Sequence, residues 1–179
     1  MKFTRTRLEG VWLIELEPRG DERGSFVRTY CEGEFAAQGL NTRWVQCNST
    51  RTRRRGSLRG LHYQADPFPE IKLIRCTTGR VLDVVVDLRQ DSPTFGKHLT
   101  IELSPELSNQ LYVPGGFAHG FQCLEDECTL FYQMSEIYHP DLARGVRWND
   151  PTLGIAWPLE VTDISDRDRK LPLLSGLSL

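Results

Sequence analysis

The sequence predicts a mainly β protein, an antiparallel sandwich or barrel with a few short helices. Short segments rich in β-branched and aromatic residues follow one another at close, fairly even spacing, and turn residues separate them. Helical periodicity is scarce, and no internal repeat or linker divides the chain. We therefore expect one domain over residues 1–179, within the usual range of roughly 100–200 residues for a single domain.

Ten segments have the composition of strands. They lie at residues 10–16, 24–30, 43–50, 57–64, 71–79, 80–89, 97–104, 109–114, 119–125 and 128–138. The segment 80–89 shows the alternation best, because one of its faces carries Leu82, Val84, Val86 and Leu88. The opposite face carries Asp83, Asp87 and Arg89.

Two segments are expected as short helices. Residues 32–39 can form two turns that end at Gly39, and residues 165–170 can form one or two turns. In the second segment, Asp168 follows Ser165 at the spacing of a capping box. Asp168 therefore has two interpretations, either a helix cap or a carboxylate that fixes the tautomer of an imidazole.

Composition limits the partners and the compartment. The formal net charge of −2 gives no general attraction to nucleic acid or to an anionic membrane, and the arginine-rich run 51–56 is interpreted as a solvated turn. Five cysteines without a CxxC pair indicate neither a disulfide framework nor a zinc ribbon. The apolar run at residues 11–14 is too short for a signal peptide, and no span of about 20 apolar residues exists, so we expect a cytoplasmic protein.

Three side chains on expected strands carry groups that can move protons or stabilise charge. His62, in "RGLHYQ", would by itself be interpreted as a hydrogen-bonded histidine on a half-buried strand. Tyr132 alternates with apolar residues and by itself would be an ordinary core tyrosine. Lys72 shares a face with Ile74 and Cys76, and burying an ammonium group is costly without a partner. Lys72 therefore suggests a functional role more strongly than Tyr132 does.

Two stretches resemble the sequence motifs of the cupins, which are small double-stranded β-helix (jelly-roll) barrels. "GLHYQADPFPEIKLIRCTTG" (60–79) is similar to the first motif, with Gln64 where a second histidine is usual, and "YVPGGFAHGF" (112–121) is similar to the second. In metal-binding cupins these stretches supply histidines and a carboxylate to a metal. The candidate ligands here are His62, Glu70 and His119, a weak set.

Eight motifs in sequence order resemble one family closely, the dTDP-4-dehydrorhamnose 3,5-epimerases and related cupin-fold nucleotide-sugar epimerases. Together they cover nearly the whole chain. They lie at residues 21–26, 46–50, 58–64, 72–96, 112–121, 131–140, 145–158 and 165–168.

The resemblance implies a role for each of four catalytic candidates. His62 matches the general base, Tyr132 the general acid, Lys72 the stabiliser of an enolate oxygen, and Asp168 the partner of the base. The implied substrate-contacting residues are Arg23, Gln46, Asn48, Arg59 and His119. Tyr138 matches an aromatic residue that stacks on the nucleotide base, and Phe26 lies in a segment that reaches the neighbouring subunit. The family is dimeric and needs neither a metal nor an organic cofactor.

A few positions do not fit a regular strand or depart from the usual residues of the family. Arg59 and His62 have opposite strand parity, so both can face one pocket only if Gly60 allows a bulge or Arg59 acts from the rim. Arg28 and Ala143 stand where the family commonly has glutamate, and "PEIK" (69–72) replaces the more usual Q-G-K.

We therefore expect an isomerase that inverts C3, C5 or both in a nucleotide-diphosphate-linked 4-keto-6-deoxyhexose through an enolate. The expected substrate is dTDP-4-dehydro-6-deoxyglucose, and the expected assembly is a homodimer with strand exchange near Phe26. Two alternatives remain open at this point. One is a metal-dependent cupin enzyme, and the other is a non-catalytic module that binds a sugar nucleotide.

Overall fold

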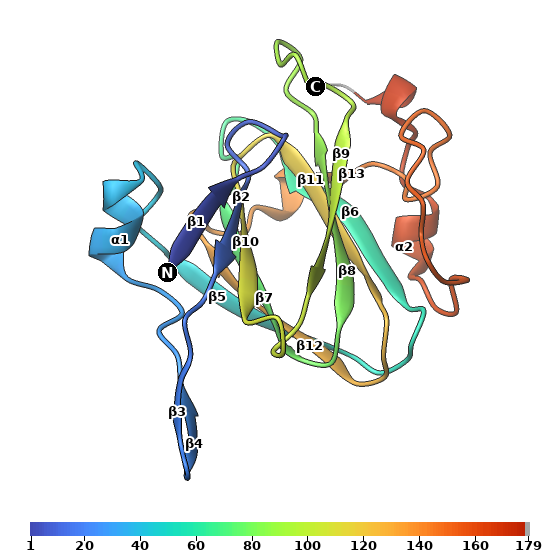
Figure 1. Cartoon of the computed structure of the whole chain (residues 1–179). Helices are drawn as coiled ribbons and strands as arrows, with labels where there is room; N and C mark the ends of the chain where they lie inside the picture. The colour runs from blue at the N-terminus through green and yellow to red at the C-terminus, as the bar shows by residue number, and fades with distance from the viewer. Residues whose placement is uncertain (178–179) are drawn as a thin grey trace.

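The computed structural model describes residues 1–177, in which two antiparallel sheets face each other (Figure 1). The six-stranded sheet has the order β1 (Lys2–Arg5), β2 (Trp12–Glu15), β10 (Asn109–Val113), β7 (Lys72–Thr78), β12 (Cys128–Met134) and β5 (Gln46–Thr52). The five-stranded sheet has the order β13 (Ala143–Gly145), β6 (Leu58–Gln64), β11 (Phe117–Cys123), β8 (Val81–Asp87) and β9 (His98–Leu103).

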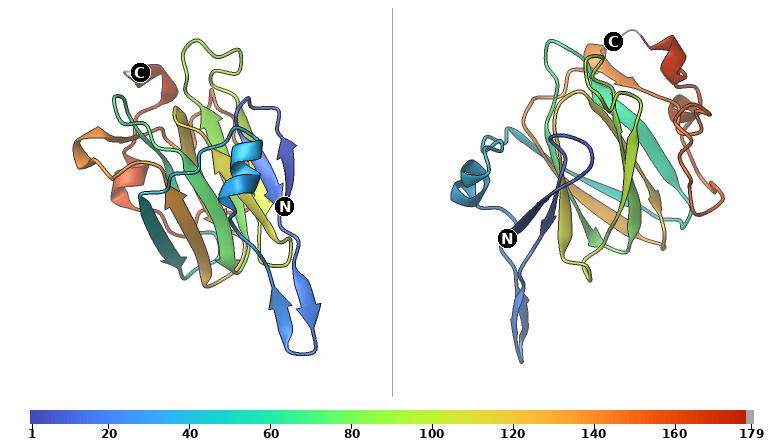
Figure 2. Two further views of the ribbon diagram at one scale, coloured as in Figure 1. Left: turned by 90° about the vertical axis from the view of Figure 1, so that its left-hand side faces the viewer. Right: turned by 45° about the horizontal axis from the view of Figure 1, so that its top comes forward.

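The remaining elements lie outside these two sheets. Strands β3 (Arg19–Asp21) and β4 (Gly24–Phe26) form a hairpin that projects from the barrel as a thin ribbon (Figure 2). The helical turns are α1 (Glu32–Ala37), α2 (Asp166–Arg169), and the two 3₁₀ turns η1 (Pro140–Leu142) and η2 (Leu174–Gly176). Among residues 1–177, no helix is long and apolar enough to cross a membrane.

The mainly β prediction is confirmed, since every expected strand overlaps an observed strand and both expected helices form. Sequence patterns missed β1, β3 and β13, which have three or four residues each. Strands this short carry little periodicity, and they are defined by pairing: β1 with β2, β3 with β4, and β13 with β6. Arg51 and Thr52 belong to β5, whereas residues 53–55 form an exposed turn, as expected for most of the run 51–56.

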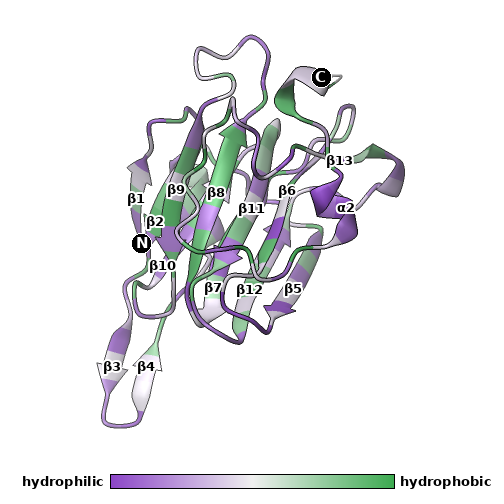
Figure 3. Cartoon of the chain, turned by 90° about the vertical axis from the view of Figure 1, so that its right-hand side faces the viewer, coloured by the Kyte–Doolittle hydropathy of each residue, from purple (hydrophilic) through white to green (hydrophobic). Residues whose placement is uncertain are grey.

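Apolar side chains form three clusters, one between the sheets and one on the outer face of each. The inter-sheet cluster contains residues of both sheets, including Ile74, Val85 and Phe121. Phe35 of α1 covers part of the six-stranded sheet's outer face, and Leu153 with neighbouring C-terminal residues covers the five-stranded sheet. In Figure 3 most of β8 has the green colour of apolar residues, whereas α2 has the purple colour of polar residues.

Strand β8 is buried on both faces. The apolar face predicted from the sequence packs against the C-terminal segment, as expected for a shared face. The opposite face is not a solvated polar surface, because Asp83 and Asp87 are fully buried. Asp87 accepts hydrogen bonds from Arg89, Ser92 and Thr94 at 2.6–2.9 Å, which compensates for its loss of water.

A β-bulge in β6 resolves the parity conflict between Arg59 and His62. Opposite β11, His62 pairs with His119 and Arg59 pairs with Phe121, so β6 has one extra residue between the two pairs. Gly60 lies in this interval with φ +111°, and a Cβ there would lie 2.7 Å from the His119 carbonyl oxygen. The bulge brings Arg59 and His62 to one pocket. This is the first of the two arrangements considered from the sequence, a bulge at Gly60 or an Arg59 that acts from the rim.

The Asp87 network predicts how stability depends on pH. Burial alone would raise the pKa of Asp87, but hydrogen bonds from Arg89, Ser92 and Thr94 lower it to about 2. The carboxylate therefore stabilises the fold above its ordinary pKa of about 4 and loses this effect as the pH falls toward 2. We expect Asp87→Asn to lower the free energy of unfolding at pH 7 by roughly 2 kcal/mol.

Urea unfolding of both proteins between pH 2 and pH 7 measures this effect. The difference between them should be constant above about pH 5 and should shrink below about pH 4. A difference that stays constant down to pH 2 would contradict the ionised network.

Candidate active site

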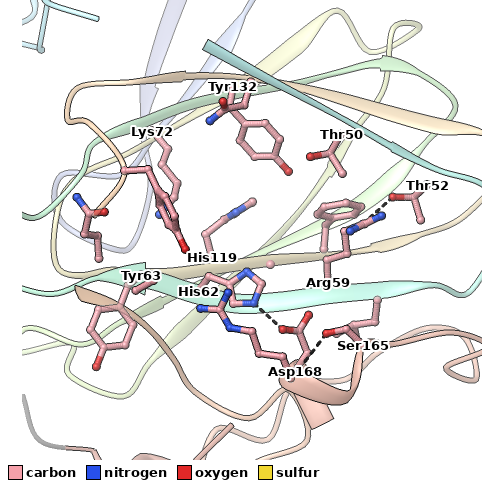
Figure 4. Close-up of a pocket in the computed structure, with 18 of the residues that line it drawn as sticks. Thr50, Thr52, Arg59, His62, Tyr63, Lys72, His119, Tyr132, Ser165 and Asp168 are labelled. Atoms are coloured by element: carbon pink, nitrogen blue, oxygen red, sulfur yellow. Dashed lines mark hydrogen bonds and ion pairs between the residues drawn. The ribbon is translucent and has the colours of Figure 1, made fainter. Parts of the chain in front are cut away.

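A cavity of about 630 Å³ opens between the sheets, beside the inter-sheet cluster. Its walls come from β5, β7 and β12 of one sheet, from β6, β11 and β13 of the other, and from α2 (Figure 4). Nine of the eleven residues predicted for the site line this cavity: Gln46, Asn48, Arg59, His62, Lys72, His119, Tyr132, Tyr138 and Asp168. Arg23 and Phe26 do not line it, because they belong to the projecting β3–β4 region.

His62 of β6 is paired with Asp168 of α2. The distance between His62 Nε2 and Asp168 Oδ1 is 2.7 Å, and the dashed line in Figure 4 marks this contact. An ionised carboxylate only accepts hydrogen bonds, so Nε2 carries a proton and Nδ1 carries the free lone pair. His62 remains partly exposed to the cavity, whereas Asp168 is buried. The arrangement gives an oriented imidazole with one nitrogen free to accept a proton.

Of the two sequence interpretations of Asp168, the contacts fit a carboxylate beside an imidazole, because the residue that caps the helix is Ser165. Ser165 caps α2, since its Oγ accepts a hydrogen bond from the Asp168 backbone N–H at 3.1 Å. The Asp168 side chain points instead to His62 and accepts a second hydrogen bond from the Gly60 N–H at 3.0 Å. Burial alone would raise the pKa of Asp168, but the hydrogen bonds from His62 and Gly60 outweigh it and lower the pKa.

Tyr132 stands on β12, in the sheet that faces His62 across the cavity (Figure 4). Its ring lies edge-on to His119, with 6.0 Å between the ring centroids. Burial raises the pKa of Tyr132 well above its ordinary value, and the charge of Asp83 raises it further. The phenol is therefore protonated at neutral pH and can donate a proton only to a strong base.

Lys72 has the buried partner that its position requires. Glu70 Oε1 lies 2.7 Å from Lys72 Nζ, and both side chains are almost wholly buried. Sequence reasoning considered Glu70 only as a metal ligand and missed this ion pair. The pair keeps a cation inside the cavity without an uncompensated charge.

His119 of β11 has a buried carboxylate partner that the sequence reasoning also missed. His119 Nε2 lies 2.7 Å from Asp83 Oδ2, and Asp83 is fully buried. Burial raises the pKa of Asp83. The sequence does contain an indication that Asp83 is buried beside a partner, because it is a charged residue on a strand with apolar neighbours on both faces.

The three candidate metal ligands are engaged in separate pairs. His62 contacts Asp168, His119 contacts Asp83, and Glu70 contacts Lys72. Within residues 1–177, no group of three or more His, Cys, Asp or Glu side chains has the arrangement of a metal site. The donor set therefore does not fit a cupin metal centre.

Polar and cationic groups line the outer part of the cavity. Arg59 Nε donates to Thr52 Oγ1 at 2.9 Å, and Gln46 Nε2 donates to Asn48 Oδ1 at 3.2 Å. The structure adds Arg144 and Arg167 to the lining, two cations that the sequence reasoning did not select. Arginine guanidinium groups suit the oxygens of a phosphate or diphosphate.

The facing antiparallel sheets and this pocket define a cupin-type enzyme that moves protons. Its pocket holds an imidazole–carboxylate pair on one wall, and a tyrosine with a buried lysine on the other. The sequence profile of the dTDP-4-dehydrorhamnose 3,5-epimerases matches residues 5–176. The chain belongs to the dTDP-4-dehydrorhamnose 3,5-epimerase family, and it has the cupin fold of that family.

Relatives match the chain over nearly its full length. The dTDP-4-dehydrorhamnose 3,5-epimerase of Methanothermobacter thermautotrophicus is 45% identical over 94% of this chain and 91% of the relative. The Bacillus anthracis enzyme, solved with TDP and PPi, has a TM-score of 0.94 and 40% identity, covering 96% of this chain and 98% of that chain. The Legionella pneumophila epimerase, solved with dTDP-4-keto-L-rhamnose, has a TM-score of 0.94 and 36% identity, covering 99% and 94%.

The contacts of Asp168 predict the effect of replacing it with asparagine. The Gly60 N–H needs an acceptor, so the asparagine carbonyl oxygen should face Gly60 and its NH₂ group should face His62 Nε2. Because two donors cannot pair, we expect His62 in Asp168→Asn to adopt the tautomer protonated at Nδ1.

¹⁵N NMR of the imidazole nitrogens distinguishes the two tautomers. The matched control is Asp166→Asn, an exposed carboxylate on the same helix, which should leave His62 protonated at Nε2. An unchanged tautomer in Asp168→Asn would show that Asp168 does not set the protonation of His62.

Proposed function

We propose that this protein catalyses the conversion of dTDP-4-dehydro-6-deoxyglucose to dTDP-4-dehydrorhamnose by inversion at C3 and C5. Its family membership makes it an isomerase, and the names of its relatives support the substrate. The observation that carries the proposal is the placement of His62 and Tyr132 on facing sheets of one pocket, with Lys72 on the same sheet as Tyr132. Inversion requires a base on one face of a carbon and an acid on the other, and this arrangement provides both.

In the first step, His62 Nδ1 removes the proton from the carbon next to the C4 ketone. The electron pair of the broken C–H bond forms a C=C bond, and the carbonyl π electrons move to O4. Asp168 stabilises the resulting imidazolium, as the pair distance of 2.7 Å allows. Lys72 would stabilise the enolate oxygen, because it is a buried cation in the cavity wall and a fixed cation acts strongly in a site shielded from water.

In the second step, the enolate collapses to the ketone and the carbon takes a proton from the Tyr132 hydroxyl on the opposite face. The raised pKa of Tyr132 keeps this proton in place until the strongly basic carbanion forms. Proton exchange with solvent returns His62 and Tyr132 to their starting states. The same two groups serve C3 and C5 in turn if the sugar ring moves between the two events.

Polar residues around the outer cavity would bind the rest of the substrate. Arg59 faces the cavity because of the bulge at Gly60, and its guanidinium suits a diphosphate oxygen. Gln46, Asn48 and His119 offer hydrogen bonds to the sugar or the nucleotide. Tyr138, with half of its surface exposed at the cavity edge, offers a flat ring for the nucleobase.

We also propose a homodimer in which the β3–β4 hairpin completes the site of the neighbouring subunit. Phe26 is 72% exposed on this hairpin, and Arg23 is highly exposed and held by Asp21 at 2.6 Å. An exposed phenylalanine on a projecting ribbon has no apolar environment in the single chain, which supports burial against a second copy.

The single epimerase domain over residues 1–179 is a further proposal, supported by the family match to residues 5–176. The cytoplasmic location stays a prediction.

The two alternatives have less support. A metal-dependent cupin enzyme needs a ligand set that His62, Glu70 and His119 do not form, since each contacts its own partner. A module that only binds a sugar nucleotide has no need of an oriented imidazole or of a buried lysine near it. That no cofactor is required stays a prediction.

Solvent deuterium exchange tests the proposed reaction. With dTDP-4-dehydro-6-deoxyglucose in D₂O, NMR should show deuterium entering at both C3 and C5. We expect His62→Ala to reduce exchange by about 10²–10⁴-fold, because it removes the base. Tyr132→Phe should reduce product formation more than it reduces the initial exchange.

Matched controls lie outside the cavity. His98→Ala on β9 and Tyr112→Phe on β10 should leave exchange close to that of the wild type. Deuterium at one carbon alone would indicate a single-centre epimerase. Normal exchange in His62→Ala would exclude His62 as the base.

Mixed dimers test whether the hairpin acts between subunits. One subunit carries His62→Ala and the other carries Phe26→Ala, and each homodimer should have low activity. In the mixed dimer, one site combines an intact His62 with Phe26 of the partner subunit, so we expect part of the activity to return. A mixed dimer no more active than the two homodimers would contradict exchange of the hairpin, as would a monomer by light scattering.

A further inference from the structure

Gln64 is a buried glutamine whose amide group has all its partners in the backbone of two neighbouring segments. Its Nε2 donates to the carbonyl oxygens of Phe68 at 2.7 Å and of Ile137 at 3.1 Å. Its Oε1 accepts from the His139 N–H at 2.8 Å. The side chain is only 3% exposed, so these hydrogen bonds replace water almost completely.

Gln64 lines the cavity, and one of the two segments that it holds carries Tyr138, which lines the cavity as well. Phe68 follows β6, and residues 137–139 follow β12, so the segments leave opposite sheets. The Phe68 and His139 rings stack with 4.5 Å between centroids and 11° between planes. Gln64 and this ring pair therefore join the two sheets at the cavity edge.

Tyr138 lies in the middle of the segment that Gln64 holds. Gln64 binds the carbonyl of the preceding residue and the N–H of the following residue, on either side of Tyr138. The Tyr138 N–H itself donates to Gln46 Oε1 at 3.2 Å. The Tyr138 ring is 51% exposed, so little packing holds it, and its direction depends mainly on this backbone.

We propose that Gln64 is a positioning residue that holds Tyr138 as the platform for the nucleobase of the substrate. This inference rests on the proposed function. It adds that the affinity for the nucleotide depends in part on Gln64, a residue that does not itself need to touch the base. A ring fixed before binding loses less conformational entropy when the base stacks on it. Gln64 thus acts on substrate binding and not on the proton transfers of His62 and Tyr132.

The amide is the group that this position requires. It supplies two donors and an acceptor in one plane, and the three contacts use all of them. A glutamate would set a carboxylate against the two carbonyl oxygens, and a histidine, usual here in metal-binding cupins, could not donate twice and also accept. Methionine has a similar length and none of the three bonds, which makes Gln64→Met the sharpest replacement.

The chain contains a matched control, Gln122 of β11. It too is a buried glutamine, and its Nε2 donates to two backbone carbonyls, those of Leu159 at 2.9 Å and Gly56 at 3.4 Å. Its Oε1 accepts the Leu159 N–H at 3.2 Å. Gln122 does not line the cavity. Gln122→Met should therefore lower stability by a similar mechanism without changing the affinity for the nucleotide.

Calorimetric titration with dTDP and steady-state epimerase assays test the proposal. For Gln64→Met we expect the Kd for dTDP and the KM for the sugar nucleotide to rise about tenfold, with kcat nearly unchanged. Gln122→Met should keep the wild-type Kd. Backbone hydrogen exchange at His139 should accelerate in Gln64→Met alone.

A double-mutant cycle with Tyr138→Ala separates positioning from general destabilisation. If Gln64 acts through Tyr138, Gln64→Met should have almost no further effect on Kd when Tyr138 is already alanine. Full additivity would overturn the proposal, as would an unchanged Kd in Gln64→Met despite faster exchange at His139. A wild-type protein that neither binds dTDP nor exchanges deuterium would overturn the proposed function and this inference together. If the wild type binds dTDP and Gln64→Met binds it with the same Kd, only the inference is overturned.

Discussion

Charge buried between two sheets needs a partner, and this constraint organises the interior of the barrel. Three ionisable side chains of the cavity each lie 2.7 Å from a carboxylate: His62 from Asp168, Lys72 from Glu70, and His119 from Asp83. Removing such groups from water is costly unless they are paired and hydrogen-bonded. The pairs therefore allow one part of the barrel to hold polar groups while the adjoining inter-sheet cluster stays apolar.

The distribution of these groups over the two sheets gives the pocket its chemical polarity. His62 and His119 come from the five-stranded sheet, whereas Lys72 and Tyr132 come from the six-stranded sheet. In the proposed reaction, a substrate held between the sheets meets the base on one side and the acid on the other. The bulge at Gly60 adds Arg59 to the same cavity, and the Gly60 N–H freed from regular pairing binds Asp168.

The edges of the barrel are joined by buried amides instead of charges. Gln64 connects segments from both sheets beside the cavity, and Gln122 binds the C-terminal segment away from it. A neutral amide avoids the desolvation cost of an ion while it satisfies backbone groups that no strand pairs. At the cavity this leaves aromatic side chains exposed on a fixed backbone, which suits a surface that receives a flat ligand.

The sequence by itself determined the mainly β class, most strand positions and the family, because alternation and ordered motifs are local signals. Of the eleven site residues predicted from it, nine line the cavity. Only the tertiary structure decided which carboxylate each histidine contacts. Asp83 and His119 are 36 residues apart, and His62 and Asp168 are 106 apart. The pairing register of the strands and the bulge in β6 bring such groups together, and neither can be predicted from the residues of a single strand. The short strands β1, β3 and β13 depend in the same way on their pairing partners.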